Sequence, residues 1–245
     1  MKLQELFTAK GYSTMEVDKL VYARDASEFE GKCEAVVWPT SKEQLMHMIK
    51  FGANDGINFT IRGAATNTMG ACIPAQSVVV DMCRLNKVLQ LGTDFIIVES
   101  GMVLRDLLGI VQKKGLFFPI KPLEYPVCTI GGMLAMNCYG LDTYYGAMEK
   151  WVEEIEVVDG NGNKIIVSGQ DMKNFIGMEG STGIIYSAKL KLLSEPMEKT
   201  ISLFKFNTLN AMMDKIMILD KVSNVLSIDF FDELCSSFLN LGQSF

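Results

Sequence analysis

The 245-residue sequence predicts an α+β fold with a large buried core. Residues 35–61 follow the order strand, helix, strand, which implies parallel strands joined by a helical crossover. Residues 87–99 and 153–168 each place β-rich runs on both sides of a short turn, as antiparallel hairpins do. Hydrophobic residues make up 49% of the chain, and a chain of this length can bury a self-sufficient core.

The first elements follow from periodicity and end signals. Residues 2–22 are amphipathic and predict helix, with a break at residues 11–13. Residues 35–38 predict a strand that ends at Pro39. A capping box from Ser41 to Gln44 then opens a predicted helix over residues 41–54.

Further strands are predicted at residues 57–61, 77–81, 87–91 and 95–99, and a helix begins near Leu104 and stops at Gly115. A hairpin follows at residues 153–158 and 164–168, and a clear alternating strand runs over residues 184–193.

Residues 194–198 form a charged linker and mark the best domain boundary. After it, the pattern predicts a strand at 201–206, a helix at 209–219 and a strand at 225–230. These last 50 residues are few for an independent domain, by the scaling of buried surface with chain length.

Charge and composition exclude several classes of protein. Lys and Arg number 23 and Asp and Glu number 29, a net charge of −6, which argues against nucleic acid as the partner. No apolar run is long enough to span a bilayer, and residues 1–5 lack the apolar core of a signal peptide. The six cysteines form no C-x-x-C pair, which predicts reduced thiols and a cytoplasmic location. With His47 as the single histidine, we expect no metal site.

Three glycine-containing segments carry the candidate chemistry. In residues 62–70, which follow a strand, small side chains let backbone N–H groups approach an anion, and Arg62 can pair with a phosphate or steady the loop. An ordinary strand-to-strand turn is an equally good interpretation.

The second segment, residues 129–137, places Gly131 and Gly132 at the start of a short helix, where exposed N–H groups could meet a pyrophosphate. Close packing through small residues is the alternative. In the third segment, residues 177–185, glycines three apart precede a strand and suggest backbone pressed against a flat ligand, or a sharp turn that needs positive φ.

Taken in order and spacing, these motifs resemble the FAD-binding (PCMH-type) domain of the vanillyl-alcohol oxidase superfamily, in the branch of the glycolate oxidase FAD subunit and the D-lactate dehydrogenases. The resemblance rests on residues 22–27, 37–39, 62–63, 80–86, 99–101, 129–137, 145–146 and 179–185.

The resemblance implies an FAD-binding domain at residues 1–195, made of two α/β subdomains (about 1–85 and 86–195), followed by the start of a truncated α/β cap domain at 196–245. FAD would lie between the subdomains. The cofactor-binding residues that it implies are Pro39, Arg62, Gly63, Ala64, Ala65, Thr66, Asn67, Pro122, Thr129, Ile130, Gly131, Gly132, Ala135, Asn137, Tyr145, Gly146, Gly180, Gly183, Ile184 and Ile185.

Within this assignment, residues 63–67 would wrap the pyrophosphate, Gly131 and Gly132 would touch it from the other side, and Ile185 would meet the adenosine half. The chain departs from the family in two ways here. Ala64 and Ala65 stand where the family has glycines. No histidine is placed to bond the flavin, and Cys128, which lies near the place where another branch forms a cysteinyl bond, differs in spacing, so we expect non-covalent FAD.

The implied activity is oxidation of a small 2-hydroxy acid, of the glycolate or D-lactate type, with hydride passing to flavin N5. No catalytic base is identified, since His47 falls on a helix surface. The alternative is an FAD-binding or interaction module without turnover of its own, completed by a partner subunit. Apolar side chains in residues 197–245 predict that the chain associates there, with itself or with a partner.

Overall fold

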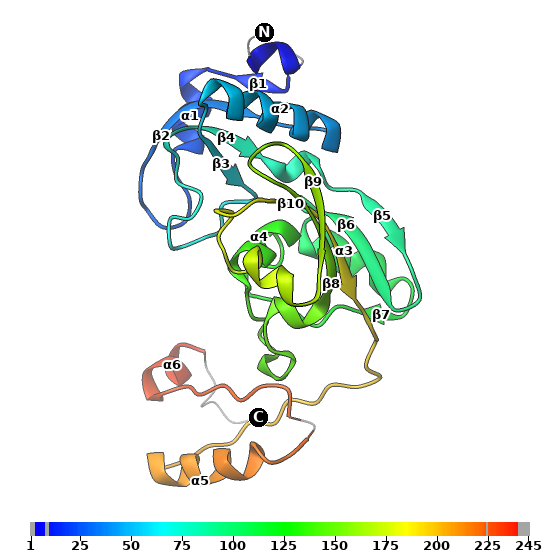
Figure 1. Ribbon diagram of the computed structural model, residues 1–245. Helices are drawn as coiled ribbons and strands as arrows, with labels where there is room; N and C mark the ends of the chain where they lie inside the picture. Colours follow the sequence, from blue (N-terminus) through cyan, green and yellow to red (C-terminus); the bar gives the residue numbers. More distant parts are fainter. Residues whose placement is uncertain (1–2, 8–9, 224, 240–245) are drawn as a thin grey trace.

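The computed structural model describes residues 3–7, 10–223 and 225–239 (Figure 1). Two sheets with their helices lie one above the other, and a C-terminal segment extends below them. We call residues 3–192 the body and residues 193–239 the tail. Of the helices in the described ranges, none is long and apolar enough to cross a membrane.

The first sheet has four strands in the order β1 (Tyr12–Ser13), β2 (Lys32–Val37), β4 (Ala75–Asp81) and β3 (Phe59–Arg62). The predicted parallel arrangement of the strands around residues 35–61 is confirmed, with one difference. β2 and β3 are not neighbours, because β4 inserts between them and is parallel to both.

The helices of this part are α1 (Glu16–Tyr22) and α2 (Lys42–Asp55), after a 3₁₀ turn at Leu3–Leu6. The break predicted at residues 11–13 is the short strand β1. Ser41 caps α2 by accepting a hydrogen bond from the Gln44 N–H at 3.2 Å, as the capping box predicts. In a standard capping box the Gln44 side chain would accept from the Ser41 N–H. Here its Oε1 accepts instead from the N–H of the preceding residue, Thr40, at 2.9 Å.

The second sheet is antiparallel throughout. Its five strands follow the order β5 (Val88–Leu91), β6 (Phe95–Glu99), β10 (Ile184–Lys191), β8 (Val152–Val158) and β9 (Lys164–Ser168). Both predicted hairpins, β5–β6 and β8–β9, are present.

Helices α3 (Leu104–Gln112) and α4 (Ile130–Met136) belong to this part of the body, together with the short strand β7 (Leu116–Phe117). β7 pairs with β11 (Leu193–Ser194), the first two residues of the tail. Short 3₁₀ helices lie at Met82–Arg84, Thr143–Tyr145, Met148–Trp151 and Gly169–Asn174.

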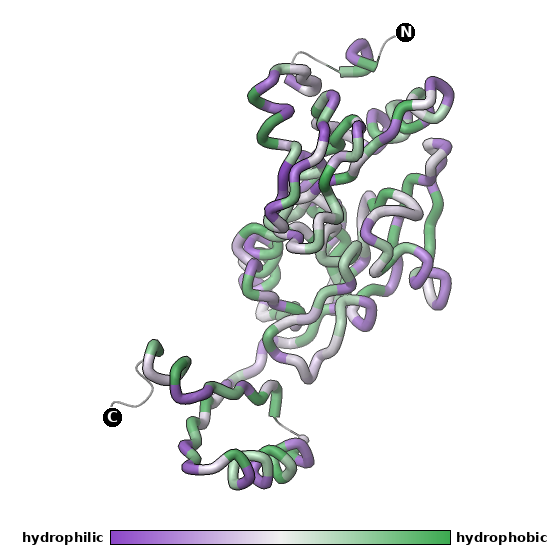
Figure 2. The backbone as a smooth tube through the Cα atoms, turned by 90° about the vertical axis from the view of Figure 1, so that its left-hand side faces the viewer, coloured by the Kyte–Doolittle hydropathy of each residue, from purple (hydrophilic) through white to green (hydrophobic). Residues whose placement is uncertain are grey.

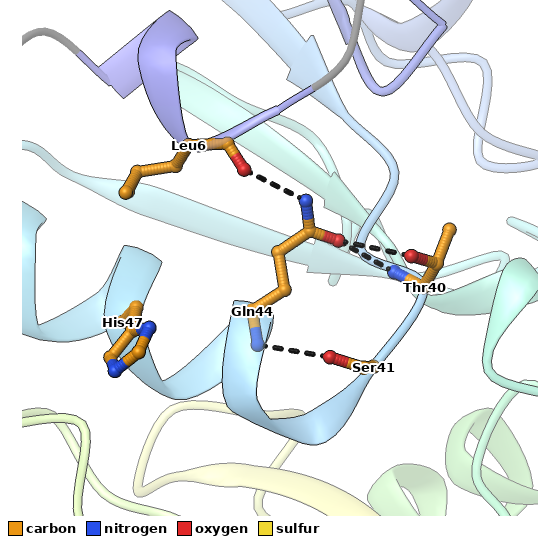
Figure 3. Close-up of a pocket in the computed structure, with 5 residues that line it drawn as sticks. All are labelled: Leu6, Thr40, Ser41, Gln44 and His47. Carbon is orange, nitrogen blue, oxygen red and sulfur yellow. Dashed lines mark hydrogen bonds between the residues drawn. The ribbon is translucent and has the colours of Figure 1, made fainter.

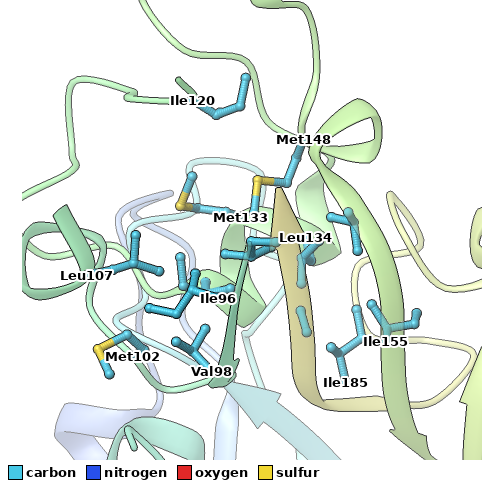
Figure 4. Close-up of a cluster of buried hydrophobic side chains, with 14 of the residues drawn as sticks. Ile96, Val98, Met102, Leu107, Ile120, Met133, Leu134, Met148, Ile155 and Ile185 are labelled. Carbon is cyan, nitrogen blue, oxygen red and sulfur yellow. The ribbon is translucent and has the colours of Figure 1, made fainter. Parts of the chain in front are cut away.

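Three hydrophobic clusters lie in the body: two larger ones join its elements, and a small one contains Ala23, Cys33, Val36 and Val79. The largest one packs β6, β8 and β10 against α3 and α4, and Figure 4 shows Ile96, Leu107, Leu134 and Ile155 meeting there. The second packs α2 on β2 and β4, and it takes in Ile184 and Tyr186 from β10. Because β10 contributes to both of the larger clusters, its first residues lie where the two parts of the body meet.

The tail departs from the sequence prediction. Helix α5 (Leu209–Leu219) is present as expected, and α6 (Glu233–Phe238) follows it. The strands predicted at 201–206 and 225–230 are wrong, because neither segment forms a strand. A strand gains its backbone hydrogen bonds only from a neighbouring strand, and no strand of the described chain lies beside these two segments.

The tail meets the body at few points. The Lys199 ammonium lies 2.7 Å from an Asp142 carboxylate oxygen, and the Tyr144 N–H donates to the Leu226 carbonyl at 2.9 Å. None of residues 193–223 or 225–239 is buried. Figure 2 shows hydrophobic stretches along this segment, and Ile201 and Phe238 are 96% and 78% exposed.

Candidate functional site

A groove lies where the two sheets meet, and it gathers residues from distant parts of the chain. Besides small and aliphatic side chains, it contains two hydroxyl groups and one carboxylate. Its lining residues are Ile61, Gly63, Met82, Ser100, Thr129, Gly131, Gly132, Ala135, Glu179, Gly180, Gly183, Ile184 and Ile185.

All three glycine-containing segments of the sequence reach this groove. Gly63 comes directly after β3, residues 129–135 include the N-cap and most of α4, and residues 179–185 lead into β10. Nine of the residues expected to bind the cofactor therefore lie together: Gly63, Thr129, Gly131, Gly132, Ala135, Gly180, Gly183, Ile184 and Ile185.

Glycine is needed at two of these positions because neighbouring segments come very close. A Cβ on Gly63 would lie 2.3 Å from Thr129 Oγ1, and a Cβ on Gly131 would lie 2.7 Å from Ser100 Cβ. Either methyl group would have to displace its neighbour. The close packing of small residues, which the sequence left open as an alternative, is thus part of how the groove is built.

The start of α4 differs from the expected open anion site. The Gly131 N–H donates to the Ser100 carbonyl at 2.7 Å, and the Gly132 N–H donates to Thr129 Oγ1 at 3.3 Å. The Ile130 N–H is also used, by the Met102 carbonyl at 2.9 Å. The first N–H groups of this helix therefore have partners within the chain, so the sequence interpretation that they are exposed is wrong.

The third segment is tied to the other end of α4. The N–H groups of Gly177 and Glu179 donate to the carbonyls of Leu134 and Ala135 at 3.0 and 2.9 Å. The Leu134 carbonyl also accepts from the Asn137 N–H at 3.0 Å, whereas Glu179 supplies the donor for the Ala135 carbonyl at the helix end. Gly180 then turns the chain with φ of +77°, a conformation in which glycine avoids a Cβ clash. The sharp turn that the sequence offered as an alternative is present.

Arg62 steadies its loop, the second of the two roles that the sequence allowed. Its guanidinium donates to the Arg24 carbonyl at 2.5 Å and lies 4.8 Å from the centre of the Tyr22 ring. The Tyr22 hydroxyl donates to Asp81 at 2.5 Å. Burial of the hydroxyl and the neighbouring Asp81 carboxylate raise the pKa of Tyr22 well above its usual range, so it stays a donor.

The rest of the 62–67 loop does not line the groove. Ala65 has φ of +56°, a left-handed conformation that costs an alanine free energy and a glycine none. Asn67 holds the loop internally, since its Oδ1 accepts from the Met69 N–H at 2.7 Å. The loop residues outside the groove lining are Arg62, Ala64, Ala65, Thr66 and Asn67.

The other expected residues lie outside the groove lining as well. Ile130 is fully buried in the larger core cluster, and Asn137 ends α4, where its Oδ1 accepts from the Glu149 N–H at 2.9 Å. Tyr145 packs edge-on against Trp151 with ring centres 5.7 Å apart. Pro39, Pro122 and Gly146 are buried at positions outside the lining.

Four lining residues are absent from the sequence prediction: Ile61, Met82, Ser100 and Glu179. Ile61 and Met82 follow the pattern of ordinary core residues, and only the parallel pairing of β3 and β4 brings their strand ends to the same edge. Glu179 has φ of +53°, and a glutamate carries no signal for that conformation.

Ser100 lies in residues 99–101, which carry part of the resemblance, but it is not among the residues expected to bind the cofactor. It is 2% exposed, and its Oγ has no hydrogen-bond partner. Only one other buried side-chain oxygen of the described residues has none, Glu156 Oε1, and it lies 2.9 Å from the Lys42 ammonium.

The ionisable groups indicate no nucleophile or metal centre near the groove. Burial raises the pKa of the Cys83 and Cys128 thiols to about 12, so both are protonated at neutral pH. His47 is exposed on α2, as expected, in a separate hollow beside Leu6 and Gln44 (Figure 3). Within residues 3–7, 10–223 and 225–239, no group of three or more candidate metal ligands occurs.

In the comparison with known families, the FAD binding domain family matches residues 33–168. Among solved structures, an alkyldihydroxyacetonephosphate synthase shares the fold with a TM-score of 0.74 at 20% identity. That likeness covers 80% of this chain and 40% of the other.

Characterised relatives are similar along most of the chain. The glycolate oxidase subunit GlcD of Bacillus subtilis is 27% identical over 216 residues, which is 82% of this chain and 46% of the relative. A D-lactate dehydrogenase of Archaeoglobus fulgidus is 26% identical over 245 residues, which is 95% of this chain and 54% of the relative. The chain thus spans about half the length of these two relatives.

Proposed function

The chain belongs to the FAD binding domain family, and from this membership we propose that it is the FAD-binding part of an oxidoreductase acting on a small 2-hydroxy acid. Its cofactor is FAD. The proposed substrates are of the glycolate or D-lactate type, because the similar proteins include a glycolate oxidase subunit and D-lactate dehydrogenases.

The observation that carries the proposal is the meeting of three distant segments in one groove. The residues present fit a dinucleotide in one respect: the buried Ser100 hydroxyl, at a residue that lines the groove, lacks a partner within the chain. A small number of polar groups that a ligand can satisfy is typical of cofactor sites.

The residues proposed to hold FAD are those of the groove. Gly63, Gly131 and Gly132 would lie beside the pyrophosphate, and Ile185 beside the adenosine. When bound, the flavin supplies the redox chemistry and accepts at N5 the hydride that the substrate loses. We propose that FAD is held without a covalent bond, because the buried Cys128 thiol is protonated at neutral pH and His47 lies in a separate hollow. No catalytic base is proposed.

The test of binding is the visible spectrum of the chain after incubation with FAD and desalting. Retained flavin bands, released by acid or heat, are the expected result for non-covalent FAD. Anaerobic addition of glycolate or D-lactate should then bleach these bands, while L-lactate serves as the matched stereochemical control. Bleaching by none of the 2-hydroxy acids would contradict the proposed substrate class.

A second candidate is an FAD-binding module that needs a partner for turnover. The tail favours it, because none of its described residues is buried and Met197 and Ile201 are almost fully exposed. We propose that residues 197–245 associate with a second copy or with another subunit; residues 240–245 lie outside the described part of the chain. Light scattering that reports a monomer at working concentration would contradict self-association, and turnover by the isolated chain would contradict the module.

A cytoplasmic location belongs to the same proposal and rests on the scattered thiols. All six cysteines are free in the structure. Cell fractionation with an antibody to the chain would test it.

A further inference from the structure

The backbone of Ser100 is fixed from both sides, whereas its side chain is left without a partner. The Ser100 N–H donates to the Tyr186 carbonyl at 2.8 Å, and its carbonyl accepts from the Gly131 N–H at 2.7 Å. The side-chain Oγ forms no hydrogen bond, although the residue is 2% exposed. The chain thus fixes the backbone of Ser100 at the groove and leaves its hydroxyl without a hydrogen bond.

Such a hydroxyl is unfavourable for the folded chain alone. Buried polar groups in native proteins are hydrogen-bonded with few exceptions, because removal from water without a new partner costs free energy. Ser77 illustrates the ordinary case: it is 3% exposed, and its Oγ lies 2.6 Å from Thr60 Oγ1. The difference between these two buried serines calls for a partner that the chain does not contain.

The surroundings of Ser100 fit a nucleotide with a flat, uncharged ring. Ile61, Met82 and Ile185 give the groove apolar walls, and none of its lining residues is Lys or Arg. β10 pairs with β6 only from Ser187 onward, so no strand covers this side of Ile184 and Ile185. An uncovered strand edge offers backbone groups to the rim of a heterocycle.

The positions of the aromatic side chains also favour the adenosine diphosphate half of FAD as the part that lies in the groove. Tyr145, one of the cofactor-binding residues that the resemblance implies, packs with Phe117 and Trp151 outside the groove lining. The groove itself contains no aromatic side chain.

We propose that the Ser100 hydroxyl hydrogen-bonds to the adenosine diphosphate half of FAD. This inference rests on the proposed use of the groove for FAD. Ser100 then carries an unsatisfied hydroxyl in the free protein that becomes satisfied on binding, so part of the chain's stability is exchanged for affinity. A hydroxyl both donates and accepts, which suits either a phosphate oxygen or an adenine nitrogen.

The experiment compares the full chain with its Ser100→Ala variant in two measurements. Calorimetric titration with FAD and with ADP should show about tenfold weaker binding by the variant, the effect of one lost hydrogen bond. FMN lacks the AMP moiety but shares one phosphate with the adenosine diphosphate half. Titration with FMN should therefore give the same affinity for both proteins when the contact lies on AMP, whereas a loss with FMN places it on the shared phosphate. The melting temperature of the variant without ligand should rise, because the unpaired hydroxyl is gone.

Ser77→Ala is the matched control, because it removes a buried serine hydroxyl that has a partner. Its melting temperature should fall, and its affinity for FAD and ADP should stay unchanged. If Ser100 had only a structural role, its substitution would leave the affinity for FAD and ADP unchanged, as Ser77→Ala does. The thermal shifts report whether each hydroxyl has a partner in the free protein, and the change in affinity separates a ligand-binding role from a packing role.

Titration with adenosine, AMP and ADP locates the contact. A loss with adenosine places the hydrogen bond on the adenine or ribose, and a loss that appears only with AMP or ADP places it on a phosphate. Equal FAD affinity in Ser100→Ala and the unaltered chain would overturn the inference and leave FAD binding intact. Normal FAD binding without bleaching by 2-hydroxy acids would instead overturn the proposed substrate class and leave the Ser100 contact standing.

Discussion

The body and the tail have similarly apolar sequences but opposite burial. In the body, Val36, Val79 and Ile96 are fully buried, because every strand they occupy has neighbours and a helix or second sheet above it. In the tail, Ile201 and Leu203 are 96% and 65% exposed. The difference teaches that an apolar pattern predicts what a segment can bury, whereas burial itself depends on a partner surface.

The largest expected effect is the contrast between two isoleucines that undergo the same substitution. Ile96→Ala removes a fully buried side chain and should lower the free energy of unfolding by about 2–5 kcal/mol. Ile201→Ala, at a 96% exposed position, should change it by less than about 0.5 kcal/mol. Urea unfolding of the two variants measures both values.

A comparable loss in Ile201→Ala would break the comparison. It would mean that the tail is covered in solution, by a second copy or by another part of the protein. Repeating the measurement over a range of chain concentrations separates these cases, because only association makes the stability depend on concentration.

The cysteines give the second contrast. Burial raises the pKa of Cys72 to about 11 and that of Cys83, Cys128 and Cys138 to about 12. Cys235, in the tail, is exposed. Since the thiolate is the reactive form, a disulfide reagent at pH 8 should modify Cys235 at least about a hundredfold faster than these four body thiols.

The reactivity of Cys235 is itself reduced, because the hydrogen bond between its thiol and the Asp232 carboxylate raises the pKa of the thiol. Asp232→Asn should therefore speed the modification of Cys235.

The body thiols also predict how the free energy of unfolding depends on pH. Their pKa values are higher in the folded chain than the ordinary value near 8.5. Their contribution to the free energy of unfolding is therefore complete below that pH and is lost as the pH rises toward 11–12. Denaturant unfolding at pH 7, 9 and 10 checks this direction, and a stability that rises over this range would contradict it.

Local signals explain which elements the sequence predicts well. The α5 helix carries its own start signal, because the Thr208 side chain accepts from the Ala211 N–H at 3.3 Å. The α+β fold class and the likeness to FAD-binding domains are confirmed by the family match and by the shared fold. The two tail strands failed because pairing is not a local property.

The candidate site shows the same limit. Glycine spacing predicts the three segments, but not that the first N–H groups of α4 are already used within the chain. Residues 99–101 carry part of the family resemblance, but the sequence does not show that the Ser100 hydroxyl is buried without a partner, because that depends on Gly131 packing against it. Whether the expected residues bind FAD stays a prediction.

The third contrast lies within the body, between two helical glycines. A methyl group on Gly131 would lie 2.7 Å from Ser100 Cβ, so Gly131→Ala should cost about 1–3 kcal/mol of stability and also weaken FAD binding. Gly109, exposed within α3, has open space around its added Cβ, and Gly109→Ala should gain about 1 kcal/mol. Thermal unfolding and FAD titration of the pair check both signs. Equal effects of the two substitutions would contradict the close approach of α4 to Ser100.

The smallest effect concerns two adjacent alanines in the 62–67 loop. Ala65 has φ of +56°, whereas Ala64 is not among the residues with positive φ. Ala65→Gly relieves the steric cost of the left-handed conformation, but it also gives the unfolded chain more freedom, so we expect a net gain of about 0.5 kcal/mol. Ala64→Gly only gives the unfolded chain more freedom, so it should lower the free energy of unfolding by about 0.5–1 kcal/mol.

These two variants also test how the loop contributes to binding. The loop outside Gly63 is fixed by its own contacts, such as the Asn67 Oδ1 bond to the Met69 N–H, and it does not line the groove. If that geometry persists in the bound state, neither substitution should change the affinity for FAD. A gain in affinity for Ala65→Gly larger than its gain in stability would mean that the loop closes onto the pyrophosphate when FAD binds, and that Ala65 restrains this closure.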